Sequence, residues 1–382
     1  MGEGPFDVLV VGAGPGGSNA AAVCLDRGLR VAQVEAREFP RVKPCAGGLT
    51  QKSIAALHYP IGACHPGESD CVSLGSWGSG AQAFHHPAPM LHFVHRPRFD
   101  QWLVERNQCQ PGFRFFAGEA VLSIEYRGRF VVRTPRRTLT ARQLIGADGS
   151  YGIVNRLFRL TSPRGSATAL EIEVPRDRFV CEATSPRFDF GAVPLGYGWV
   201  FPKRDYWSVG LYTLAQKTPE LRKTLARYVE DAGFGSANEF EVRGHRYPVG
   251  GYRIRVPECP LYLVGDAGGF AEAITGEGIY AALESGRLAG FTAAAVAEGR
   301  GEPQLYYRML RRRVLRDTFL SWKIARIFYR NPAGWLRAFG HPLVWRTIVE
   351  GYSEGATLAN CVFRSGLYFL RSWRPGVRRT VV

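Results

Sequence analysis

The glycines at positions 12, 14, 16 and 17 have a spacing that could bind a phosphate-containing ligand. The first glycine permits a tight turn, Gly14 lets the backbone approach a pyrophosphate, and Gly17 lets a helix pack closely on a strand. Glu35, about 20 residues farther on, can accept hydrogen bonds from ribose hydroxyl groups. The pattern therefore predicts the binding of a dinucleotide.

Two aspartates far along the chain indicate which dinucleotide is bound. Asp148 ends the run Ile145-Gly146-Ala147, and Asp266 ends the apolar run that begins at Leu261. An aspartate at a strand end, beside the start of the next helix, can accept a hydrogen bond from a ribityl hydroxyl group. Nicotinamide dinucleotides lack a ribityl chain, whereas flavins contain one. The cofactor is therefore expected to be FAD.

A cysteine and several glycines follow the first of these regions, in the stretch FPRVKPCAGGL at positions 39–49. Glycines at 47 and 48 let the backbone pass close to a bound ring. Cys45 can place a small, weakly acidic side chain beside that ring, so we expect Cys45, Ala46 and Gly48 to adjoin the cofactor. The alternative for Cys45 is an inert packing residue.

Alternating strands and helices must bring these residues together. Apolar runs predict strands at 7–11, 29–34 and 261–266, and small residues predict helices at 18–25 and 278–288. The expected fold class is α/β, with a Rossmann-like FAD-binding domain, an inserted β-sheet substrate domain and a C-terminal helical region. The substrate domain is indicated by β-type stretches such as 207–212 and 240–242. We expect FAD-binding segments at 1–75, 96–160 and 251–300, substrate-domain segments at 76–95 and 161–250, and a basic helical region at 301–382.

From about residue 5 to residue 300 these motifs resemble the geranylgeranyl reductases, a family of FAD-dependent oxidoreductases with the aromatic-hydroxylase fold. The resemblance implies that Gly12, Gly14 and Gly16 contact the pyrophosphate and that Glu35 contacts the adenosine ribose. The other residues that it implies at the cofactor are Arg96 on the flavin side, Ala120 near the adenine, Asp266 at the ribityl chain, and Gly278 and Ile279 at the isoalloxazine edge. The alternative for Arg96 is a surface arginine that caps a helix.

Two signatures favour the reductases over other flavoproteins of this fold. The sequence Pro-Cys-Ala-Gly-Gly-Leu at 44–49 resembles the reductase signature, whereas flavin halogenases continue from the same Phe-Pro-Arg with Gly-Glu-Ser. The run at 197–203, Tyr-Gly-Trp-Val-Phe-Pro-Lys, is similar to the reductase pattern Y-x-W-x-F-P. Tyr197, Trp199 and Phe201 alternate, so on a strand they would share one face and could line an apolar tunnel. The alternative is that they form plain core.

This resemblance implies an enzyme that saturates C=C bonds of a prenyl, geranylgeranyl-type chain on a lipid, quinone or chlorophyll-type precursor. Such a reduction needs a hydride, from reduced FAD, on one carbon and a proton on the other. The expected catalytic residues are Cys45, Tyr197 and Trp199, with Cys45 or a water near Tyr197 as the source of the proton. Two alternatives stay open: an FAD-dependent monooxygenase that hydroxylates or epoxidises a hydrophobic intermediate, and a membrane-associated flavin-binding protein without turnover.

The electron donor and the partners are less sharply defined. Since only one glycine fingerprint is present, NAD(P)H would bind transiently, or reduced ferredoxin would supply the electrons. The net charge is +16, and positions 301–382 hold 15 Lys and Arg against 4 Asp and Glu, mixed with aromatic residues. Helices predicted at 315–330, 335–339 and 345–349 could contact an anionic membrane or an acidic ferredoxin. The alternative is a solvated basic cap.

Several other classes of site and location are not expected. No recognised DNA or RNA module accompanies the charge, so nucleic acid is not an expected partner. The histidines at 85, 86, 92 and 95 lack carboxylate or thiol partners at ligand spacing, so no metal site is expected. Eight cysteines without a CxxC pair, no leader before the first strand and no membrane-length apolar run predict a cytoplasmic protein with reduced thiols, peripheral to the membrane if bound there.

Overall fold

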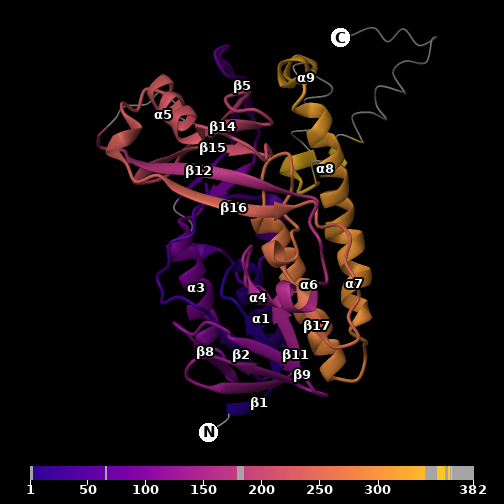
Figure 1. Ribbon diagram of the computed structural model, residues 1–382. Coiled ribbons are helices and arrows are strands. Elements are labelled where there is room, and N and C mark those ends of the chain that lie inside the picture. Colours follow the sequence, from indigo (N-terminus) through magenta and orange to yellow (C-terminus); the bar gives the residue numbers. More distant parts are fainter. Residues whose placement is uncertain are drawn as a thin grey trace, which may run out of the picture.

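The structure is a computed structural model that describes residues 3–64, 67–178, 185–339, 351–357, 360, 361 and 363. Two large sheets form two layers, and helices near the C-terminus run along one side of both (Figure 1). The lower layer holds the N-terminal strand and the upper layer holds the inserted sheet. The expected α/β fold class is confirmed.

The lower sheet is built around β1 (Glu3–Val11), whose side chains at 8, 9 and 10 are fully buried. Its four central strands are parallel, in the order β8-β2-β1-β11, and β17 continues the parallel pairing beside β11. Two antiparallel strands complete the sheet on the same edge of β11 as β17, away from β1. The remaining bounds are β2 (Val31–Val34), β8 (Phe113–Phe116), β9 (Ser123–Tyr126), β10 (Phe130–Arg133), β11 (Thr138–Gly146) and β17 (Leu261–Leu263).

Helices pack on this sheet where small residues allow close approach. Helix α1 (Pro15–Asp26) follows the glycine turn and lies against α6 (Ile279–Ala297), with Gly286 and Gly290 on α6 facing the α1 backbone. A Cβ at Gly286 would lie 2.2 Å from the carbonyl oxygen of Gly16, so only glycine fits there. The other helices of this part are α2 (Gln51–Ala56), α3 (Arg96–Gln108) and α4 (Ile153–Phe158), with short 3₁₀ turns at Gly62–Cys64 and Gly265–Ala267.

The upper sheet has the order β16-β12-β15-β14-β13-β5-β6. Helix α5 (Leu221–Asp231) covers one face, where it packs on the side chains at 172, 174, 200, 209 and 211. The opposite face carries the alternate residues and turns toward the lower layer. The strands are β5 (Cys71–Ser76), β6 (Ala81–His85), β12 (Gly165–Pro175), β13 (Arg187–Phe190), β14 (Gly196–Pro202), β15 (Tyr206–Thr213) and β16 (Arg243–Val249); a 3₁₀ turn, Ala237–Glu239, follows α5.

The boundaries of the upper sheet differ from the predicted ones in three places. Strand β5 begins at Cys71, so the chain enters this sheet before position 76. Strand β7 (Leu91–Phe93) belongs to neither large sheet, because it pairs with β3 (Gly48–Thr50) and β4 (Gly67–Ser69) in a third, three-stranded sheet. The strand predicted at 240–242 is wrong, since those residues form a loop and the strand starts at Arg243.

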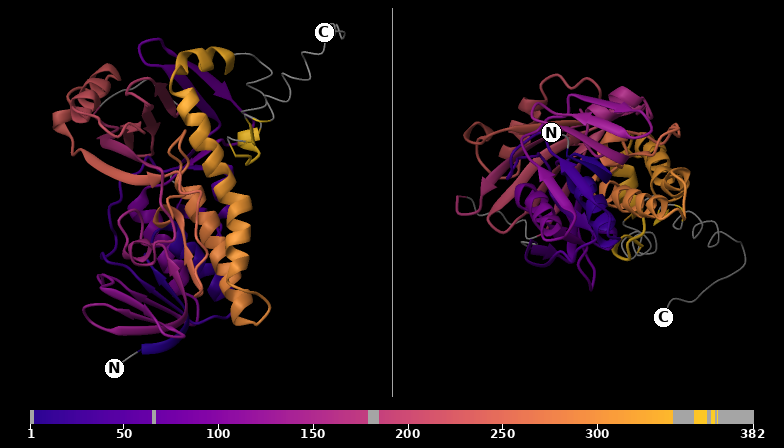
Figure 2. Two further views of the ribbon diagram at one scale, coloured as in Figure 1. Left: turned by 45° about the vertical axis from the view of Figure 1, so that its right-hand side comes forward. Right: turned by 90° about the horizontal axis from the view of Figure 1, so that it is seen from below.

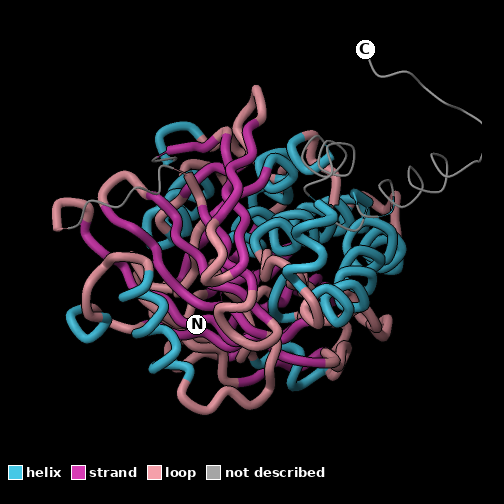
Figure 3. The backbone as a smooth tube through the Cα atoms, turned by 90° about the horizontal axis from the view of Figure 1, so that it is seen from above, coloured by secondary structure: helices cyan, strands magenta, loops and turns pink. Residues whose placement is uncertain are grey.

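The described part of the C-terminal region is mainly helical, as predicted. Helix α7 (Gln304–Leu310) continues through a π-helical turn (Arg311–Leu315) into α8 (Arg316–Phe328), and α9 (Pro332–Phe339) follows. Together α7 and α8 run from the lower layer to the upper one (Figure 2). Seen from above, the largest group of helices lies on one side of the sheets, and smaller helices lie on the opposite side (Figure 3). The helix predicted at 345–349 lies outside the described residues. None of the described helices combines the length and the apolar character that a membrane crossing requires.

Candidate active site

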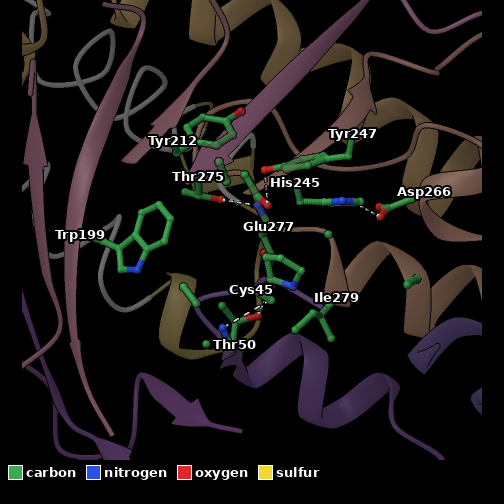
Figure 4. Close-up of a pocket in the computed structure, with 18 of the residues that line it drawn as sticks. Cys45, Thr50, Trp199, Tyr212, His245, Tyr247, Asp266, Thr275, Glu277 and Ile279 are labelled. Carbon is green, nitrogen blue, oxygen red and sulfur yellow. Dashed lines mark hydrogen bonds and ion pairs between the residues drawn. The ribbon is translucent and has the colours of Figure 1, made fainter. Parts of the chain in front are cut away.

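One large cavity of about 330 Å³ lies between the two layers and α8. Figure 4 shows Asp266 at one end of this space and Trp199 at the other, with Cys45 and Thr50 on one side and Tyr212 and Tyr247 opposite them. The elements that line the cavity come from the whole length of the chain, from the α1 start to α8. The cavity is therefore formed by the fold as a whole.

The glycine turn forms an end of the cavity that is suited to a phosphate group. Gly14, Gly16 and Gly17 line it, and Gly14 stands at the N-terminal end of α1, where free backbone N–H groups favour an anion. A Cβ at Gly16 or Gly17 would meet neighbouring atoms at 2.5 and 2.3 Å, whereas a Cβ at Gly14 would meet only the Arg41 guanidinium, at 3.7 Å. Gly16 and Gly17 thus serve close packing, and Gly14 leaves open space for a ligand.

A buried network of charges extends from this turn. The Glu35 carboxylate accepts a hydrogen bond from the Ala13 N–H at 2.9 Å and lies 3.3 Å from the guanidinium of Arg41. Arg41 also pairs with Asp100 at 3.2 Å. Arg96 binds the same Asp100 through two hydrogen bonds, of 2.9 and 2.8 Å. Burial disfavours the charge of Arg96, but Asp100 outweighs this effect and raises its pKa.

Arg96 is therefore not a surface residue that caps a helix. Only 6% of it is exposed, and it lines the cavity at the start of α3. The fixed, charged guanidinium can meet a polar edge of a ligand, because Asp100 holds it in a single orientation.

Asp266 stands at the β17 end beside three polar side chains. Its Oδ2 lies 3.1 Å from the Lys43 Nζ, 3.4 Å from the Ser150 Oγ and 4.0 Å from the His245 Nε2. Burial acts to raise the pKa of Asp266, but the Lys43 ammonium and His245 outweigh it and lower the pKa. Asp266 is thus a charged acceptor, which suits hydroxyl groups of a ligand. Asp148 differs: it accepts the Val154 N–H at 2.8 Å and holds the start of α4.

The Cys45 loop passes along the cavity wall and is fixed by side chains from the upper sheet. The backbone N–H of Cys45 donates to Glu171 on β12 at 2.8 Å, and Lys203 Nζ donates to the Gly47 carbonyl at 3.0 Å. Gly47 has a φ of 63°, and a Cβ there would lie 2.2 Å from the carbonyl oxygen of Val94. Glycine is therefore required at position 47 for the turn and for the close approach.

The opposite wall is aromatic. Tyr197, Trp199 and Phe201 project from β14 into the cavity, while Gly198, between them, faces Tyr228 of α5 on the other side of the sheet. The alternation predicted from the sequence is confirmed. Val72, Leu74, Phe188, Phe190, Ile324 and Phe328 extend this wall with apolar side chains from β5, β13 and α8.

Tyrosine hydroxyl groups hold a loop between the wall and α6. Tyr212 donates to the Ala273 carbonyl at 2.8 Å and Tyr247 to the Gly276 carbonyl at 3.3 Å, and Tyr197 donates to the Thr275 carbonyl. Burial raises the pKa of all three groups. Since the Tyr197 hydroxyl proton is directed at a carbonyl group, this side chain shapes the wall and fixes the loop.

Glu277, just before α6, connects this loop to α2. Its carboxylate accepts hydrogen bonds from Thr50 Oγ1 at 2.7 Å and Ser53 Oγ at 3.1 Å, and pairs with the buried Lys52 at 2.6 Å. Gly278 and Ile279 follow at the helix start, and both line the cavity. The α6 end is therefore held rigidly beside the Cys45 loop.

The structure brings most of the predicted site residues together. The cavity is lined by Gly14, Gly16, Gly17, Cys45, Ala46, Gly48, Arg96, Tyr197, Trp199, Asp266, Gly278 and Ile279. Three others lie outside this lining. Gly12 lies in the glycine turn behind the lining, and Glu35 accepts a hydrogen bond from the Ala13 N–H of that turn. Ala120 is exposed and follows Glu119, whose N–H donates to the Glu35 carbonyl.

Sequence reasoning did not find several polar residues of the cavity. Lys43, Glu171, Tyr212, His245, Tyr247 and Glu277 all line it. Lys43 stands inside the stretch 39–49 that the sequence analysis examined, and Glu277 directly precedes the helix predicted at 278–288, so both lay beside residues already expected at the site. Glu171 lies in an alternating strand with no distinctive spacing, and only the sheet pairing brings it to the cysteine loop.

The cavity fits FAD. The open backbone at Gly14 and the charged acceptor Asp266 match a pyrophosphate and a polyhydroxyl chain, and the cavity wall at the Cys45 loop matches a flat ring. The FAD binding domain family matches residues 5–179. The fold and the site thus define an FAD-dependent oxidoreductase. Among the residues described, no three His, Cys, Asp or Glu side chains gather as metal ligands would.

Comparison with known proteins identifies the family of this flavoprotein. It is 35% identical over 331 residues to an uncharacterized protein of Methanosarcina barkeri, with 85% of this chain and 84% of that one covered. It is 32% identical over 315 residues to digeranylgeranylglycerophospholipid reductase 1 of Methanopyrus kandleri, covering 77% and 81%. The solved structure of a geranylgeranyl bacteriochlorophyll reductase-like protein from Thermoplasma acidophilum has the same fold, with a TM-score of 0.76, 21% identity and coverage of 94% and 95%. The chain belongs to the geranylgeranyl reductase family of FAD-dependent oxidoreductases.

Proposed function

We propose that this protein uses FAD to saturate C=C bonds in a prenyl, geranylgeranyl-type chain of a lipid. The observation that carries the proposal is a single cavity that continues from the glycine turn, past the Cys45 loop, to an apolar slot between the upper sheet and α8. The name of the M. kandleri relative describes a reductase of a digeranylgeranyl glycerophospholipid, which supports a prenyl lipid as substrate.

The cofactor would lie along the residues that sequence and cavity have in common. Gly14, Gly16 and the α1 start would hold the pyrophosphate, with Gly12 shaping the turn, and Asp266 would hold the ribityl chain. Glu35 and Ala120 would flank the adenosine end. The ring would adjoin Arg96, the Cys45-to-Gly48 backbone, and Gly278 and Ile279. Bound reduced FAD supplies a hydride.

The apolar slot would hold the prenyl chain. Leu74 and Phe188 of the upper sheet and Phe328 of α8 offer apolar surface to the slot, and Phe190 packs edge-on against the Phe328 ring with 5.0 Å between ring centroids. Burying an alkene chain there gains roughly 0.8 kcal/mol for each buried methylene group. The same wall excludes water from the reacting carbons, with Trp199 fixed by its Nε1–H···Oγ bond to Ser208 at 3.0 Å.

The C-terminal helices would bring the protein to its substrate. Phe319 and Ile327 on α8 and Trp335 on α9 are exposed, among exposed arginines of the same helices. Arginines that meet anionic headgroups, with rings at the interface, support peripheral contact with a membrane that contains the lipid. Electrons would come from NAD(P)H or from a reduced ferredoxin, whose acidic surface would suit the same arginines.

The direct test uses anaerobic protein kept reduced with dithionite and supplied with a geranylgeranyl glycerophospholipid. Mass spectrometry is expected to show product that has gained two hydrogen atoms for each double bond reduced. If turnover requires O₂ and the product carries ¹⁸O from labelled oxygen, the protein is a monooxygenase and the proposal is wrong. Stable FAD without turnover of any prenyl lipid would also contradict it.

A further inference from the structure

Glu171 on β12 is a buried carboxylate at the cavity wall that the cofactor site does not use. Its residue is only 5% exposed, and it lines the cavity next to the Cys45 loop. One oxygen, Oε1, accepts the Cys45 N–H at 2.8 Å. No described residue donates a hydrogen bond to the other oxygen, Oε2. One half of the carboxyl group thus fixes the loop, and the other half is free to exchange a proton.

A buried lysine faces the same loop. Lys203, 3% exposed, donates from Nζ to the carbonyl groups of Gly47 at 3.0 Å and Val94 at 3.5 Å, and its ammonium lies over the Phe93 ring. Burial lowers the pKa of Lys203 to about 7 and raises the pKa of Glu171 to about 7. Both groups therefore change protonation near neutral pH, and both hydrogen-bond to the backbone of the Cys45 loop.

Two partly exposed titratable residues lie near Glu171, one of them on the same strand. Glu173 lies two residues beyond Glu171, on the same face of β12, and its Oε1 is 3.8 Å from the Nε2 of His95. The side chains of His95 and Glu173 are 39% and 32% exposed. The titratable and charged groups that act on Glu171 from the packed elements are Glu173, Lys203, Arg243, Cys45 and Tyr206.

We propose that Glu171 is the acid that protonates the substrate, and that Glu173 and His95 return a proton to it from solvent. This inference rests on the proposed reduction of a prenyl double bond, and it names the proton donor for that reaction. Cys45 then positions the loop through its backbone, and Lys203 is a positioning residue that acts through the same loop.

The step balances. One alkene carbon receives a hydride with its electron pair from reduced FAD, and the other carbon receives the proton of the Glu171 carboxyl group. Two C–H bonds form, while the π bond of the alkene, the O–H bond of the acid and the N–H bond that holds the hydride in reduced FAD break. Glu171 is left as a carboxylate, which takes its next proton by way of Glu173 and His95. The FAD is left oxidised and is reduced again by the electron donor.

The test is Glu171→Gln, which keeps an oxygen acceptor for the Cys45 N–H but cannot transfer a proton. We expect FAD content and KM to stay within about twofold of the unmodified protein and kcat to fall roughly 10²- to 10³-fold. In the unmodified enzyme kcat should decrease as pH rises through about 7, because the acid form is lost. The matched control is Glu230→Gln, an exposed change on α5, on the other face of the sheet. Equal kcat for Glu171→Gln and the control would overturn the inference.

A second readout does not depend on turnover. Infrared difference spectra of the FAD-loaded protein without substrate should show a protonated carboxyl band that disappears as pH rises through about 7. The band should be missing in Glu171→Gln and retained in Glu230→Gln. Burial raises the pKa of Asp148 to about 6, so its band would disappear at lower pH; a band that still titrates through about 7 in Glu171→Gln would overturn the assignment. If the unmodified protein reduces the lipid and Glu171→Gln does so at the same rate, this inference alone is wrong. If the unmodified protein does not reduce the lipid, the proposed function is wrong.

Discussion

At the scale of single residues, the cavity separates charged groups from apolar ones. Asp266 carries its charge beside Lys43 and His245 at one end, whereas Trp199 and Phe201 present apolar surface at the other. Burial lowers the pKa of His245 to about 4, so its imidazole is neutral at pH 7 and Lys43 is the cation beside Asp266. In the proposed function, this arrangement would hold the cofactor at the polar end and leave the apolar end for the substrate.

Replacing Asp266 with alanine should weaken FAD binding. Loss of a hydrogen bond to a charged group costs about 1.5–3 kcal/mol, which corresponds to about 10- to 100-fold in affinity. The purified variant should be largely colourless, as measured by its visible flavin absorbance. Asp26→Ala, an exposed change at the end of α1, is the control and should keep its colour. A fully yellow Asp266→Ala protein would contradict the position assigned to the cofactor.

Cys45→Ser tests the thiol itself. Its Sγ accepts the Gly47 N–H at 3.4 Å, an interaction that a hydroxyl group can replace, so FAD should be retained. Because the thiol lines the cavity, we expect kcat to change by at least threefold or so, within the range typical of a single substituted contact. Cys109→Ser, at an exposed position, provides the comparison. Identical rates for the two variants would reduce Cys45 to a packing residue.

At the scale of secondary structure, α8 forms one wall of the slot. Ile324 and Phe328, one turn apart, line the cavity, whereas Ile327 on the same helix is 57% exposed. The inner face of α8 can therefore set the length of chain that the slot accepts, and the outer face can change without effect on it.

Ile324→Trp should shorten the slot. The larger ring would occupy space that a long prenyl chain needs, so kcat/KM for a geranylgeranyl substrate should fall at least tenfold, and that for a geranyl substrate should fall much less. The control, Ile327→Trp, makes the same change on the outer face. FAD absorbance reports folding in both. Equal losses for the two substrates would show that the slot does not hold the chain.

The elements also explain what the sequence could and could not reveal. The glycine turn, Glu35 and the alternating aromatics of β14 are local patterns, so they predicted the cofactor fold and the aromatic wall. Contact between Cys45 and Glu171 joins residues 126 positions apart and depends on the upper sheet meeting the loop. Strand β16 was misplaced by three residues because Phe240 and Val242 have strand-type side chains, yet they pack beside α5 as a loop.

At the scale of the whole molecule, the outer surface of the basic C-terminal helices points away from the two sheets. These helices run along one side of both layers (Figure 2), so their outer surface stays accessible, while the inner surface of α8 closes the cavity. A membrane contact on that side would place the lipid store beside the slot.

Vesicle binding tests this surface. The protein should sediment with vesicles that contain anionic phospholipid at low salt and be released as salt increases, because screening weakens arginine–headgroup attraction. Ile327→Glu with Trp335→Glu should reduce binding at least tenfold, since each apolar side chain contributes roughly 1.5–3 kcal/mol when buried. Leu122→Glu, an exposed apolar residue beside β9, should bind like the unmodified protein. Equal sedimentation of the unmodified protein, the double variant and Leu122→Glu would rule out this surface as the membrane contact.

The most direct measurement of the central claim is a single turnover without oxygen. Protein with its FAD reduced by one equivalent of dithionite is mixed anaerobically with a geranylgeranyl lipid, and the flavin absorbance and the product mass are followed together. We predict that the absorbance of oxidised FAD returns in the absence of O₂, with one double bond saturated for each flavin. FAD that stays reduced until O₂ enters, with oxygen then found in the product, would contradict the account.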